Sequence, residues 1–575
     1  MSYTVIHVTH EAVQKVGGIG AVLEGLITSS IYQKEVDRSF LVGPLESPEY
    51  EDVLAGCGEV IFSTISGINR SEFADALNNI ADRYNVNLVY GKRAFPGGCE
   101  ADVLLIDGAD LNPRMSRNFK YNLYNRFGLR SDLYESVSDY LLYLDIAEAA
   151  YDALAAFLEQ DGGPHIVLAH EYMGMPLALK TLLSDDPRFR AIFYAHEVST
   201  MRSLVENHPG HDVMFYNTLS EALVQGTTVD EVFGDHSDHY RHALVGLASH
   251  CDGIFAVGDP TLEELRFMGH SFQDYPIDLV YNGIPAHQLE GEEKLHSRSC
   301  LQNYAAYLLG FTPDVVLSHV TRPVISKGLW RDLLVLTHID RLLADQNKTG
   351  VFFVLTTAGG RRSPEDILDL ETQYGWPVVH RPGAPDLVGP EVDIWREMEA
   401  FNGRSVAIKA VLVNQFGWDR MSCGKRMPED MRFADLRQGT DVEFGQSIYE
   451  PFGIAVLEPL TYGSICVPSN VCGCCGFVDR VVTGDAKPHV VVADYTTGMQ
   501  SLESGLDVGG EIRSRHEVEV AEKTAWEIVA ALPQSDEERT SRLDSGYNLA
   551  SLMSWDRVCE SFFLPSIERA ISRRL

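Results

Sequence analysis

The sequence has no uninterrupted apolar run of about eighteen residues, the length that a membrane-spanning helix needs. Its first residues, Met1 to His7, lack the basic start and apolar stretch of a signal peptide, so we expect a cytoplasmic protein. Lys and Arg total only 47 against 82 Asp and Glu, a formal charge of −35. This imbalance argues against binding to nucleic acid or to an anionic membrane. Small molecules or neutral polymers are the expected partners.

Cysteine is scarce, with ten residues in 575, and its spacing is not that of a disulfide framework, so we expect reduced thiols. Four cysteines lie between Cys466 and Cys475. A metal site and a tight crossing of a strand and a loop are both compatible with this cluster. The cluster lacks the paired Cys-x-x-Cys spacing of a zinc site, which favours packing.

Length and a hydrophobic content of 45% predict a globular protein with two sizeable domains. Apolar strands alternate with amphipathic helices in both halves, which predicts an α/β fold. We place the first domain at 1–285 and the second at 286–553, with an insertion at about 359–409. The polar segment His287–Lys294 is interpreted as the link, and 554–575 as a C-terminal helix.

A glycine loop follows the first predicted strand, Tyr3–Val8. It contains Lys15, Gly17 and Gly18 and opens a helix. Paired glycines let a ligand approach the backbone, and the lysine adds a cation, which suits a phosphate group. The loop matches neither the dinucleotide-binding fingerprint nor a Walker loop, and a role in helix packing is equally compatible with it.

Two later strands of the first half end in the same pair of residues. Ile166–Ala169 leads into His170 and Glu171, and Ile192–Ala195 leads into His196 and Glu197. Open parallel sheets bind ligands at the carboxyl ends of their strands, so these side chains are candidates for binding sugar hydroxyls. The alternative is that each His is satisfied by the backbone. A metal site among the histidines of 236–250 is also conceivable, but a polar helix face explains that composition.

In the second half, the strand Asp314–Val320 is followed by Arg322 and Lys327. Two cations at the end of a strand can neutralise a diphosphate leaving group without a metal ion. The sequence also contains no Asp-x-Asp, the motif expected of metal-dependent enzymes that use sugar nucleotides. We therefore expect no metal cofactor. A solvated basic loop is the alternative.

The segment Tyr449–Glu458 places two carboxylates eight positions apart, at Glu450 and Glu458. Pro451 and Gly453 form a turn that feeds the apolar run Ile454–Leu457, where a helix is predicted to begin. Amides at Gly453, Ile454 and Ala455 would then be open to an anion, with Glu458 about two turns further along the helix. An ordinary surface turn with solvated carboxylates remains the alternative.

Taken together, these segments resemble the glycogen and starch synthases. The resemblance follows family order along nearly the whole chain. It rests on the glycine loop, the His170-Glu171-Tyr172-Met173 and His196 positions, Asn282-Gly283-Ile284, the Arg322 and Lys327 pair, the Glu450 to Glu458 signature and Ser554-Trp555.

The resemblance implies a GT-B fold, in which two facing Rossmann-like domains flank a cleft and the C-terminal helix returns to the N-terminal domain. It also implies transfer of glucose from a nucleoside-diphosphate glucose to the non-reducing end of an α-1,4-glucan, with retention at the anomeric carbon and no metal. The catalytic residues would be Arg322, Lys327, Glu450 and His196. Donor binding would fall to Lys15, Gly17, Gly18, Gly453, Ile454, Ala455 and Glu458, and the acceptor or sugar side to His170, Glu171 and Glu197.

The nucleotide base of the donor stays open. Arg-x4-Lys and Ser554-Trp555 resemble the bacterial and plant branch, which implies ADP-glucose, whereas His170-Glu171-Tyr172-Met173 resembles the animal and fungal branch, which implies UDP-glucose. Two other functions are compatible with the sequence. One is a retaining GT-B glycosyltransferase with a small sugar acceptor, and the other is a non-catalytic glucan-binding protein. A homo-oligomer is also possible, and the sequence does not indicate allosteric control.

Overall fold

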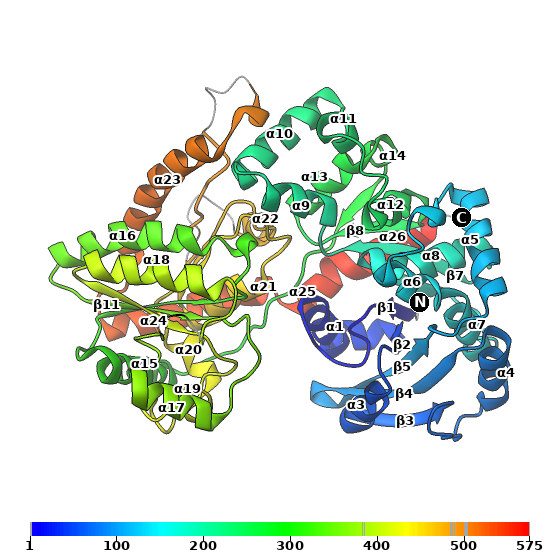
Figure 1. The fold of residues 1–575 in the computed structure, drawn as a ribbon, viewed down its shortest axis with the longest axis horizontal. Coiled ribbons are helices and arrows are strands. Elements are labelled where there is room, and N and C mark those ends of the chain that lie inside the picture. Colours follow the sequence, from blue (N-terminus) through cyan, green and yellow to red (C-terminus); the bar gives the residue numbers. More distant parts are fainter. Residues whose placement is uncertain are drawn as a thin grey trace. The chain divides into compact units, whose positions relative to one another are not determined.

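A computed structural model describes residues 3–573 except 382, 384, 385, 483–486, 488 and 499–503. The chain divides into two compact units (Figure 1). Unit 1 comprises Met1–Arg202, Ala222–Gly283 and Trp555–Leu575, and unit 2 comprises Ser203–Glu221 and Ile284–Ser554. The segment Ser203–Glu221 thus belongs to unit 2, although it lies within the sequence range of the predicted first domain.

Unit 1 is built on a sheet of nine strands in the order β3-β4-β5-β2-β1-β6-β7-β8-β9. The strands pair in parallel, except that β4 runs antiparallel to β3 and β5. The predicted strands at the N-terminus and before the two His-Glu pairs are confirmed, whereas the antiparallel β3 and β4 were not predicted. The strand bounds are β1 Tyr3–Val8, β2 Val36–Pro44, β3 Gly58–Ser63, β4 Asn87–Phe95, β5 Cys99–Asp107, β6 His165–His170, β7 Phe189–Ala195, β8 Gly253–Ala256 and β9 Ile277–Leu279.

Helices connect these strands, and α9 and α10 extend into the segment that belongs to unit 2. The polar histidine-rich segment at 236–250 is helical only from Tyr240 onward, because the residues before it form turns. The helices are α1 Gly18–Thr28, α2 Ser30–Glu35, α3 Glu49–Cys57, α4 Ala74–Tyr84, α5 Pro113–Phe127, α6 Ser138–Leu144, α7 Ala147–Phe157, α8 Glu171–Ser184, α9 Ser199–Asn207, α10 His211–Gln225, α11 Val229–Phe233, α12 Tyr240–Gly246, α13 Asp259–Met268 and α14 His270–Gln273.

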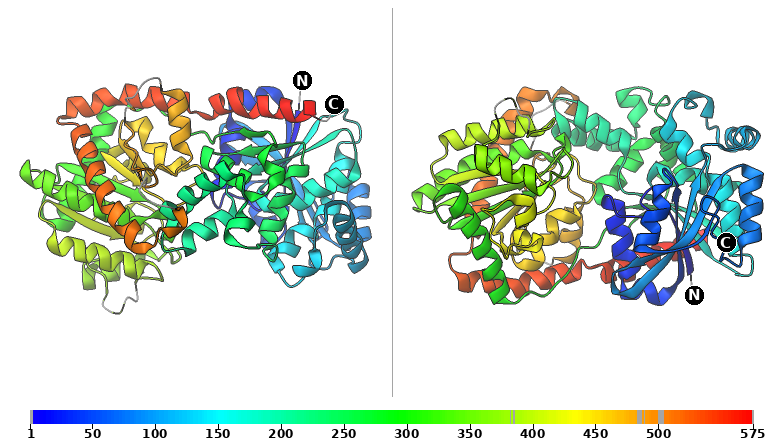
Figure 2. Two further views of the ribbon diagram at one scale, coloured as in Figure 1. Left: turned by 90° about the horizontal axis from the view of Figure 1, so that it is seen from above. Right: turned by 60° about the horizontal axis from the view of Figure 1, so that its bottom comes forward.

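The C-terminal helices α25 (Trp555–Val558) and α26 (Leu564–Arg573) pack on unit 1, as predicted. The last helix is red in Figure 2 and lies along unit 1. A Cβ atom at Gly25 or Gly283 would collide with the Trp555 ring, so both positions need glycine. Asp556 accepts hydrogen bonds from the hydroxyls of Ser29 (2.6 Å) and Ser30 (2.9 Å). These contacts hold the end of the chain on α1 and α2.

Unit 2 contains a parallel sheet of five strands in the order β12-β11-β10-β13-β14. Alternate side chains of β10 face opposite sides of the sheet. Val315 and Leu317 pack with α16, α18 and α23, whereas Val316 packs with α15 and α17. In Figure 1 these two groups of helices lie on opposite faces of the sheet. The bounds are β10 Val315–Val320, β11 Gly350–Leu355, β12 Ile408–Val413, β13 Val442–Gly445, β14 Ile465–Pro468, α15 Gly291–Leu309, α16 Leu329–Asp345, α17 Pro364–Tyr374, α18 Glu391–Arg404, α19 Arg420–Cys423, α20 Phe433–Gly439, α21 Ile454–Leu457, α22 Cys474–Val481, α23 Gly510–Ala531 and α24 Asp536–Leu552.

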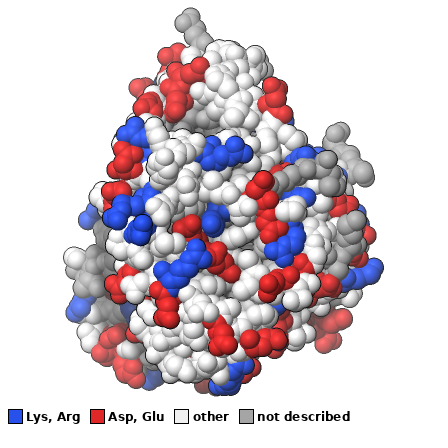
Figure 3. All heavy atoms as spheres, turned by 90° about the vertical axis from the view of Figure 1, so that its right-hand side faces the viewer, with Lys and Arg blue, Asp and Glu red and all other residues white. Residues whose placement is uncertain are grey.

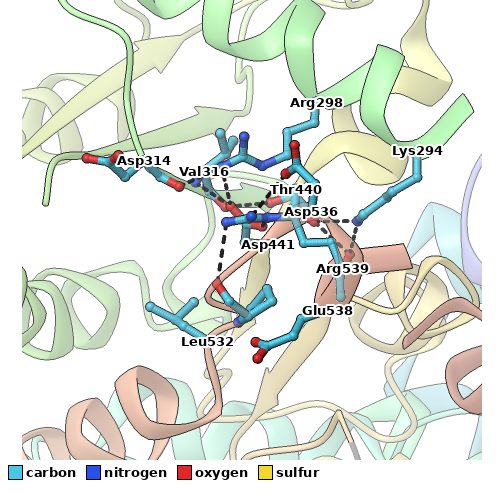
Figure 4. Close-up of polar contacts among 12 residues, drawn as sticks. Lys294, Arg298, Asp314, Val316, Thr440, Asp441, Leu532, Asp536, Glu538 and Arg539 are labelled. Atoms are coloured by element: carbon cyan, nitrogen blue, oxygen red, sulfur yellow. Dashed lines mark hydrogen bonds and ion pairs between the residues drawn. The ribbon is translucent and has the colours of Figure 1, made fainter. Parts of the chain in front are cut away.

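The segment predicted as a polar link is in part the start of a helix. α15 begins at Gly291, and Lys294 is buried in unit 2 rather than solvated. Its ammonium donates to the Thr440 carbonyl (2.9 Å) beside the buried carboxylate of Asp441 (Figure 4). Polarity predicted an exposed link because the partners of Lys294 lie about 150 residues further along the chain.

The surface carries charges of both signs. On the face drawn in Figure 3, the described Lys and Arg side chains are interspersed with Asp and Glu and form no continuous basic band. Within the part of the chain that the structure describes, none of the helices combines the length and the hydropathy that a membrane crossing requires.

Candidate functional site

The central contact of the candidate site in unit 2 joins Lys327 and Glu450. Lys327 ends a short 3-10 turn that follows β10, and Glu450 follows β13, the neighbour of β10 in the sheet. Because the strands are parallel, both loops leave from the same edge of the sheet. The Lys327 ammonium donates to the Glu450 carboxylate, and the two side chains remain 20% and 15% exposed. The structure thus brings together two residues that the sequence separates by more than a hundred positions.

The backbone around Glu450 is fixed by hydrogen bonds to two other loops. The amide of Ile448 donates to the Ser326 carbonyl (2.8 Å), which ties the Glu450 loop to the Lys327 loop. On the other side, the amide of Gly473 donates to the Glu450 carbonyl (3.1 Å). The carboxylate and the ammonium therefore stand on loops that are anchored at the same edge of the sheet, which fixes the position of the pair.

The cysteine cluster forms the second of these anchoring loops. All ten cysteines lie within the described residues, and none forms a disulfide. Cys472 donates from its thiol to the Gly445 carbonyl (3.5 Å), and Cys475 donates to the Ser469 carbonyl (3.4 Å). Their burial and these backbone contacts agree with the packing interpretation of the sequence. The loop that carries the cluster thus supports the Glu450 loop through the Gly473 amide.

The predicted helix after Gly453 is much shorter than expected. α21 spans only Ile454–Leu457 and passes into a 3-10 turn at Glu458–Tyr462, so the placement of Glu458 two turns along one helix was wrong. Gly453 has a φ of 93°, and a Cβ there would lie 3.0 Å from Glu450 Cγ. Glycine is thus required at this turn. A single helical turn adds little macrodipole, so an anion here would depend on direct hydrogen bonds to the amides.

Arg437 of α20 is a site residue that the sequence analysis did not identify. Its guanidinium pairs with Glu458, lies 3.2 Å from the Glu443 carboxylate and donates to the Ala455 carbonyl (3.1 Å). It thereby fixes both ends of the turn that follows Gly453. Nothing in the local sequence of Phe433–Gly439 marks this arginine, because its partners come from later loops.

Arg322, the other predicted cation, is exposed. Its guanidinium forms no ion pair with any carboxylate among the described residues. Of the two predicted cations, Lys327 is thus engaged with Glu450, and Arg322 extends into solvent where an anionic ligand could recruit it.

In unit 1 the predicted histidines belong to a buried chain of hydrogen bonds. His170 Nδ1 lies 2.7 Å from His196 Nε2, and His170 Nε2 lies 3.0 Å from His7 Nδ1. His7 Nε2 is 3.0 Å from the Tyr32 hydroxyl, which is 2.8 Å from Ser39 Oγ. The chain therefore runs from the protein interior to His196 at the end of β7. His7 was not singled out from the sequence, because it lies inside a predicted strand.

This chain couples the protonation sites of its members. A neutral imidazole donates from one nitrogen and accepts at the other, so each link fixes the direction of the next. When Tyr32 donates to His7, every ring donates toward His196, and His196 Nδ1 then carries a proton. In the opposite direction, His196 Nδ1 is an acceptor. Burial lowers the pKa of His7 and of His196 to about 3, so both rings stay neutral at ordinary pH.

Glu171 holds the backbone that follows β7. Its Oε1 accepts hydrogen bonds from the amides of His196 and of Glu197 (2.6 Å for the second). Its own φ is 61°, an unusual conformation for a residue other than glycine. Burial and the nearby Glu197 carboxylate raise the pKa of Glu171 well above its usual value, against the effect of the two amides. Glu197 itself pairs with Arg202 at 2.9 Å. Glu171 is thus committed to positioning the His196 backbone.

We expect His7→Phe to destabilise unit 1 by about 1–3 kcal/mol, because it leaves His170 Nε2 without a buried partner and removes one of the two partners of the Tyr32 hydroxyl. An unfolded His binds a proton near pH 6.5, whereas His7 does so only near pH 3. The stability that neutral His7 contributes is therefore present above pH 6.5 and is lost as the pH falls toward 3. His7→Phe lacks this titrating group, so its free energy of unfolding should fall less steeply over the same pH range. Urea unfolding at several pH values measures both effects.

His165 provides the matched control for this prediction. It is equally buried, on the neighbouring strand β6, but neither of its ring nitrogens has a hydrogen-bond partner among the described residues. His165→Phe should therefore stay within about 1 kcal/mol of the wild type. Equal effects of the two substitutions would contradict a role for the hydrogen-bonded chain.

The backbone amides of the glycine loop are already bound by a carboxylate of the chain itself, that of Glu11. Glu11 Oε2 accepts hydrogen bonds from the amides of Val16 and Gly17, both at 2.6 Å. Lys15 turns to Glu24, with Nζ 3.0 Å from Oε2. A phosphate at this loop would have to displace Glu11 or use the amide of Gly18. The donor-binding role of Lys15, Gly17 and Gly18 stays a prediction, and Glu11 is the residue that the sequence analysis missed here.

Comparisons with known proteins show the fold of the chain. No protein-family model matches it, and no curated protein is similar to it in sequence. Among solved structures, the catalytic domain of starch synthase IV from Arabidopsis thaliana, bound to ADP and acarbose, is similar over 99% of both chains, with 14% identity and a TM-score of 0.50. Sucrose-phosphate synthase from Thermosynechococcus elongatus covers 100% of both chains at 10% identity and a TM-score of 0.49. The likeness to starch synthase establishes an α/β, GT-B-like fold with two Rossmann-like domains.

Proposed function

We propose that the chain is a retaining GT-B glycosyltransferase that transfers glucose from ADP-glucose or UDP-glucose to the non-reducing end of an α-1,4-glucan. The observation that carries the proposal is the Lys327–Glu450 pair at the carboxyl ends of two adjacent parallel strands. A cation and a carboxylate held together at this edge suit a ligand with a diphosphate next to a sugar, because the first needs positive charge and the second needs hydrogen-bond acceptors.

Lys327 and Arg322 are assigned to the departing diphosphate. An ammonium has three N–H donors, so Lys327 can keep its contact with Glu450 and still donate to a phosphate oxygen. The exposed Arg322 can add a bidentate contact. The amides of Gly453, Ile454 and Ala455 are assigned to the same group. These donors would stabilise the negative charge that grows on the leaving group as the glycosidic bond breaks.

Glu450 is assigned to the hydroxyls of the transferred glucose, and Glu458 to the nucleotide ribose. His196 is assigned to the positive charge that develops at the anomeric carbon, through its main-chain carbonyl. Glu171 supports this role, because it fixes the amides of His196 and Glu197 and so orients the adjoining peptide groups. The proposal includes no covalent nucleophile, in line with the resemblance to the retaining synthases.

The proposal is tested by the release of nucleoside diphosphate from ADP-, UDP- and GDP-glucose, with and without glycogen. The ADP and acarbose in the starch synthase IV structure make ADP-glucose and a malto-oligosaccharide the first pair to assay. We expect glycogen-dependent release with one donor, together with elongation of the glucan. Release that depends on a monosaccharide or a sugar phosphate would instead indicate a small acceptor. Failure to release a diphosphate from any donor would contradict the proposal.

Glu450 and Glu458, the two carboxylates of the segment Tyr449–Glu458, should affect different kinetic constants. Glu458→Gln is expected to raise KM for the donor about tenfold with little change in kcat, because it weakens a ribose contact and the pairing with Arg437. Glu450→Gln should instead lower kcat. Steady-state kinetics with the active donor measure both, and Glu519→Gln, an exposed position on α23, serves as the control. A fall in kcat for Glu458→Gln equal to that for Glu450→Gln would contradict the division of roles.

A further inference from the structure

We propose that His296, Cys300 and Asp430 form a binding site for a divalent transition metal ion of the Zn²⁺ class. The three residues lie in unit 2, on the side of the sheet away from α16 and α18. His296 and Cys300 are four positions apart on α15, so their side chains lie on the same face of the helix. Asp430 comes from the loop between α19 and α20.

The three potential ligand atoms already lie close together. His296 Nε2 is 3.4 Å from Asp430 Oδ2, and Cys300 Sγ is 3.7 Å from His296 Nε2 and 3.8 Å from Asp430 Oδ2. No other group of three His, Cys, Asp or Glu side chains with such proximity occurs among the described residues. The arrangement is therefore not a general consequence of the acidic composition.

These separations match those that a tetrahedral metal ion imposes. Zn²⁺ binds His nitrogen and carboxylate oxygen at about 2.0–2.2 Å and Cys sulfur at about 2.3 Å, which places neighbouring ligand atoms about 3.3–3.6 Å apart. The distance between His296 and Asp430 lies within this range, and the two distances to Cys300 Sγ exceed it only slightly. Small rotations of the two exposed side chains, His296 (53%) and Asp430 (61%), would close the difference.

The donor set and its exposure indicate which metal it would take. Imidazole and thiolate together favour Zn²⁺ or Co²⁺ over Mg²⁺ and Ca²⁺, which prefer oxygen. Cys300 is 3% exposed and would lie at the base of the site, and because His296 and Asp430 are exposed, a fourth position would face solvent. Three protein ligands with an open position bind a water molecule or a further ligand.

A metal ion here would link α15 to the loop that leads into α20, the helix that carries Arg437. α15 already contacts α20 through Ser297, whose hydroxyl donates to Asp435 Oδ1 at 2.7 Å. Asp430 lies in the loop that enters α20, and Arg437 on that helix pairs with Glu443 and Glu458. The ion would thus join α15 to the segment that positions α20. Asp430 lies 130 positions after Cys300, so the three residues come together only in the folded chain.

The test uses the full-length protein after removal of bound metal with a chelator. Titration with Co²⁺ should produce the near-ultraviolet band of a thiolate–cobalt bond, saturating at a single ion per chain, and Zn²⁺ should abolish the band. Zn²⁺ should also raise the melting temperature by roughly 2–4 °C or more at saturating concentration. Absence of the thiolate band would overturn the proposal.

Variants make the assignment specific. Cys300→Ser should eliminate the band, and Asp430→Asn, at an exposed position, should weaken Co²⁺ binding about tenfold or more. Glu429→Gln, a carboxylate in the same loop, and Cys99→Ser, a partly exposed thiol of unit 1, are the controls and should bind Co²⁺ as the wild type does. Unchanged binding in Asp430→Asn would show that the three residues hold only a hydrogen-bonded cluster. Because the readout is metal binding, the result is independent of transferase activity.

Discussion

Asp441→Asn is expected to destabilise unit 2 by about 3–5 kcal/mol, the cost of removing one partner from a buried ionic cluster. Asp441 is 1% exposed and accepts from Arg539 Nε and from the amide of Val316, both at 2.9 Å. Arg298 lies 3.5 Å away, and Lys294 is buried beside it. Figure 4 shows these side chains converging on the one carboxylate. Asparagine would leave the buried cations without a compensating charge.

The loss of stability in Asp441→Asn should depend on pH. Burial would raise the pKa of Asp441, but Arg298, Arg539 and Lys294 outweigh it and hold that pKa below its usual value. Burial also lowers the pKa of Lys294 from 10.5 to about 8. Between pH 8 and 10.5, Lys294 is therefore protonated in the unfolded chain but deprotonated in the folded protein. The unfolded state binds the extra proton, so the free energy of unfolding rises with pH over this range. Without Asp441 the pKa of Lys294 falls further, and the variant should be less impaired at pH 9 than at pH 6.

Asp536→Asn is the matched control for this cluster. Asp536 pairs with the same Arg539, at 3.2 Å, but is 59% exposed. Exposed pairs contribute about 0–1 kcal/mol, so its loss should be small. Urea unfolding at pH 6 and pH 9 compares the three proteins. A small effect for both substitutions, or a larger loss for Asp441→Asn at pH 9, would contradict the account of the cluster.

The strands that position the site were predictable because each is a short apolar run that ends in a polar residue. Val315–Val320 and Phe189–Ala195 are buried along their whole length, or nearly so, and continuous hydrophobicity is typical of parallel strands covered on both faces. His196 follows its strand directly, and Lys327 ends the short turn after β10. Their placement at a sheet edge therefore follows from local sequence and strand direction alone.

The residues that were missed act through partners distant in the sequence. Lys294 was interpreted as part of a solvated link, yet it is buried against a carbonyl about 150 positions away. Arg437 and His7 carry no local signal, because an arginine in a short helix and a histidine in a strand occur for many reasons. Glu11 lies only a few residues before the loop that it supports, but the paired glycines were interpreted as a phosphate-binding loop. A burial pattern cannot show which charge neutralises which.

For the segment after Gly453, the sequence predicted where a helix begins but not how long it is. The predicted turn before Ile454 is present, whereas the helix ends after one turn. Leu457 is followed by the Glu458-Pro459 pair, and proline within the following turn favours 3-10 geometry over a longer helix. Arg437, rather than a helix dipole, then stabilises this region. The site in unit 2 is accordingly held by ion pairs between residues distant in the sequence, Lys327 with Glu450 and Arg437 with Glu443 and Glu458.

Lys327→Met is expected to reduce the release of nucleoside diphosphate about 10²–10³-fold, the effect of removing a donor that stabilises developing charge. In the proposed reaction, the Lys327 ammonium faces the diphosphate as it leaves. Methionine keeps the apolar stem of the side chain and leaves the backbone hydrogen bond from the Lys327 amide to the Val324 carbonyl in place. The loss should appear mainly in kcat, because the charge on the leaving group grows in the transition state.

Two controls separate this effect from a loss of folding. Lys523→Met removes an exposed cation from α23 of the same unit and should leave turnover unchanged. Lys327→Met should unfold within about 1 kcal/mol of the wild type, because its pair with Glu450 is partly exposed and is screened by solvent. A variant that is folded but releases diphosphate within about threefold of the wild type would contradict the assignment of Lys327.

The double variant Lys327→Met/Glu450→Gln tests whether the pair acts as a unit. If Lys327 serves the diphosphate and Glu450 holds the sugar of the same donor, their losses should be less than additive, because the second substitution acts on a site that is already misaligned. Additive losses would instead indicate two independent contacts. The same cycle with Arg322→Met in place of Lys327→Met should be closer to additive, because Arg322 does not contact Glu450 in the described structure. The comparison shows whether the ion pair itself, rather than positive charge alone, organises the site.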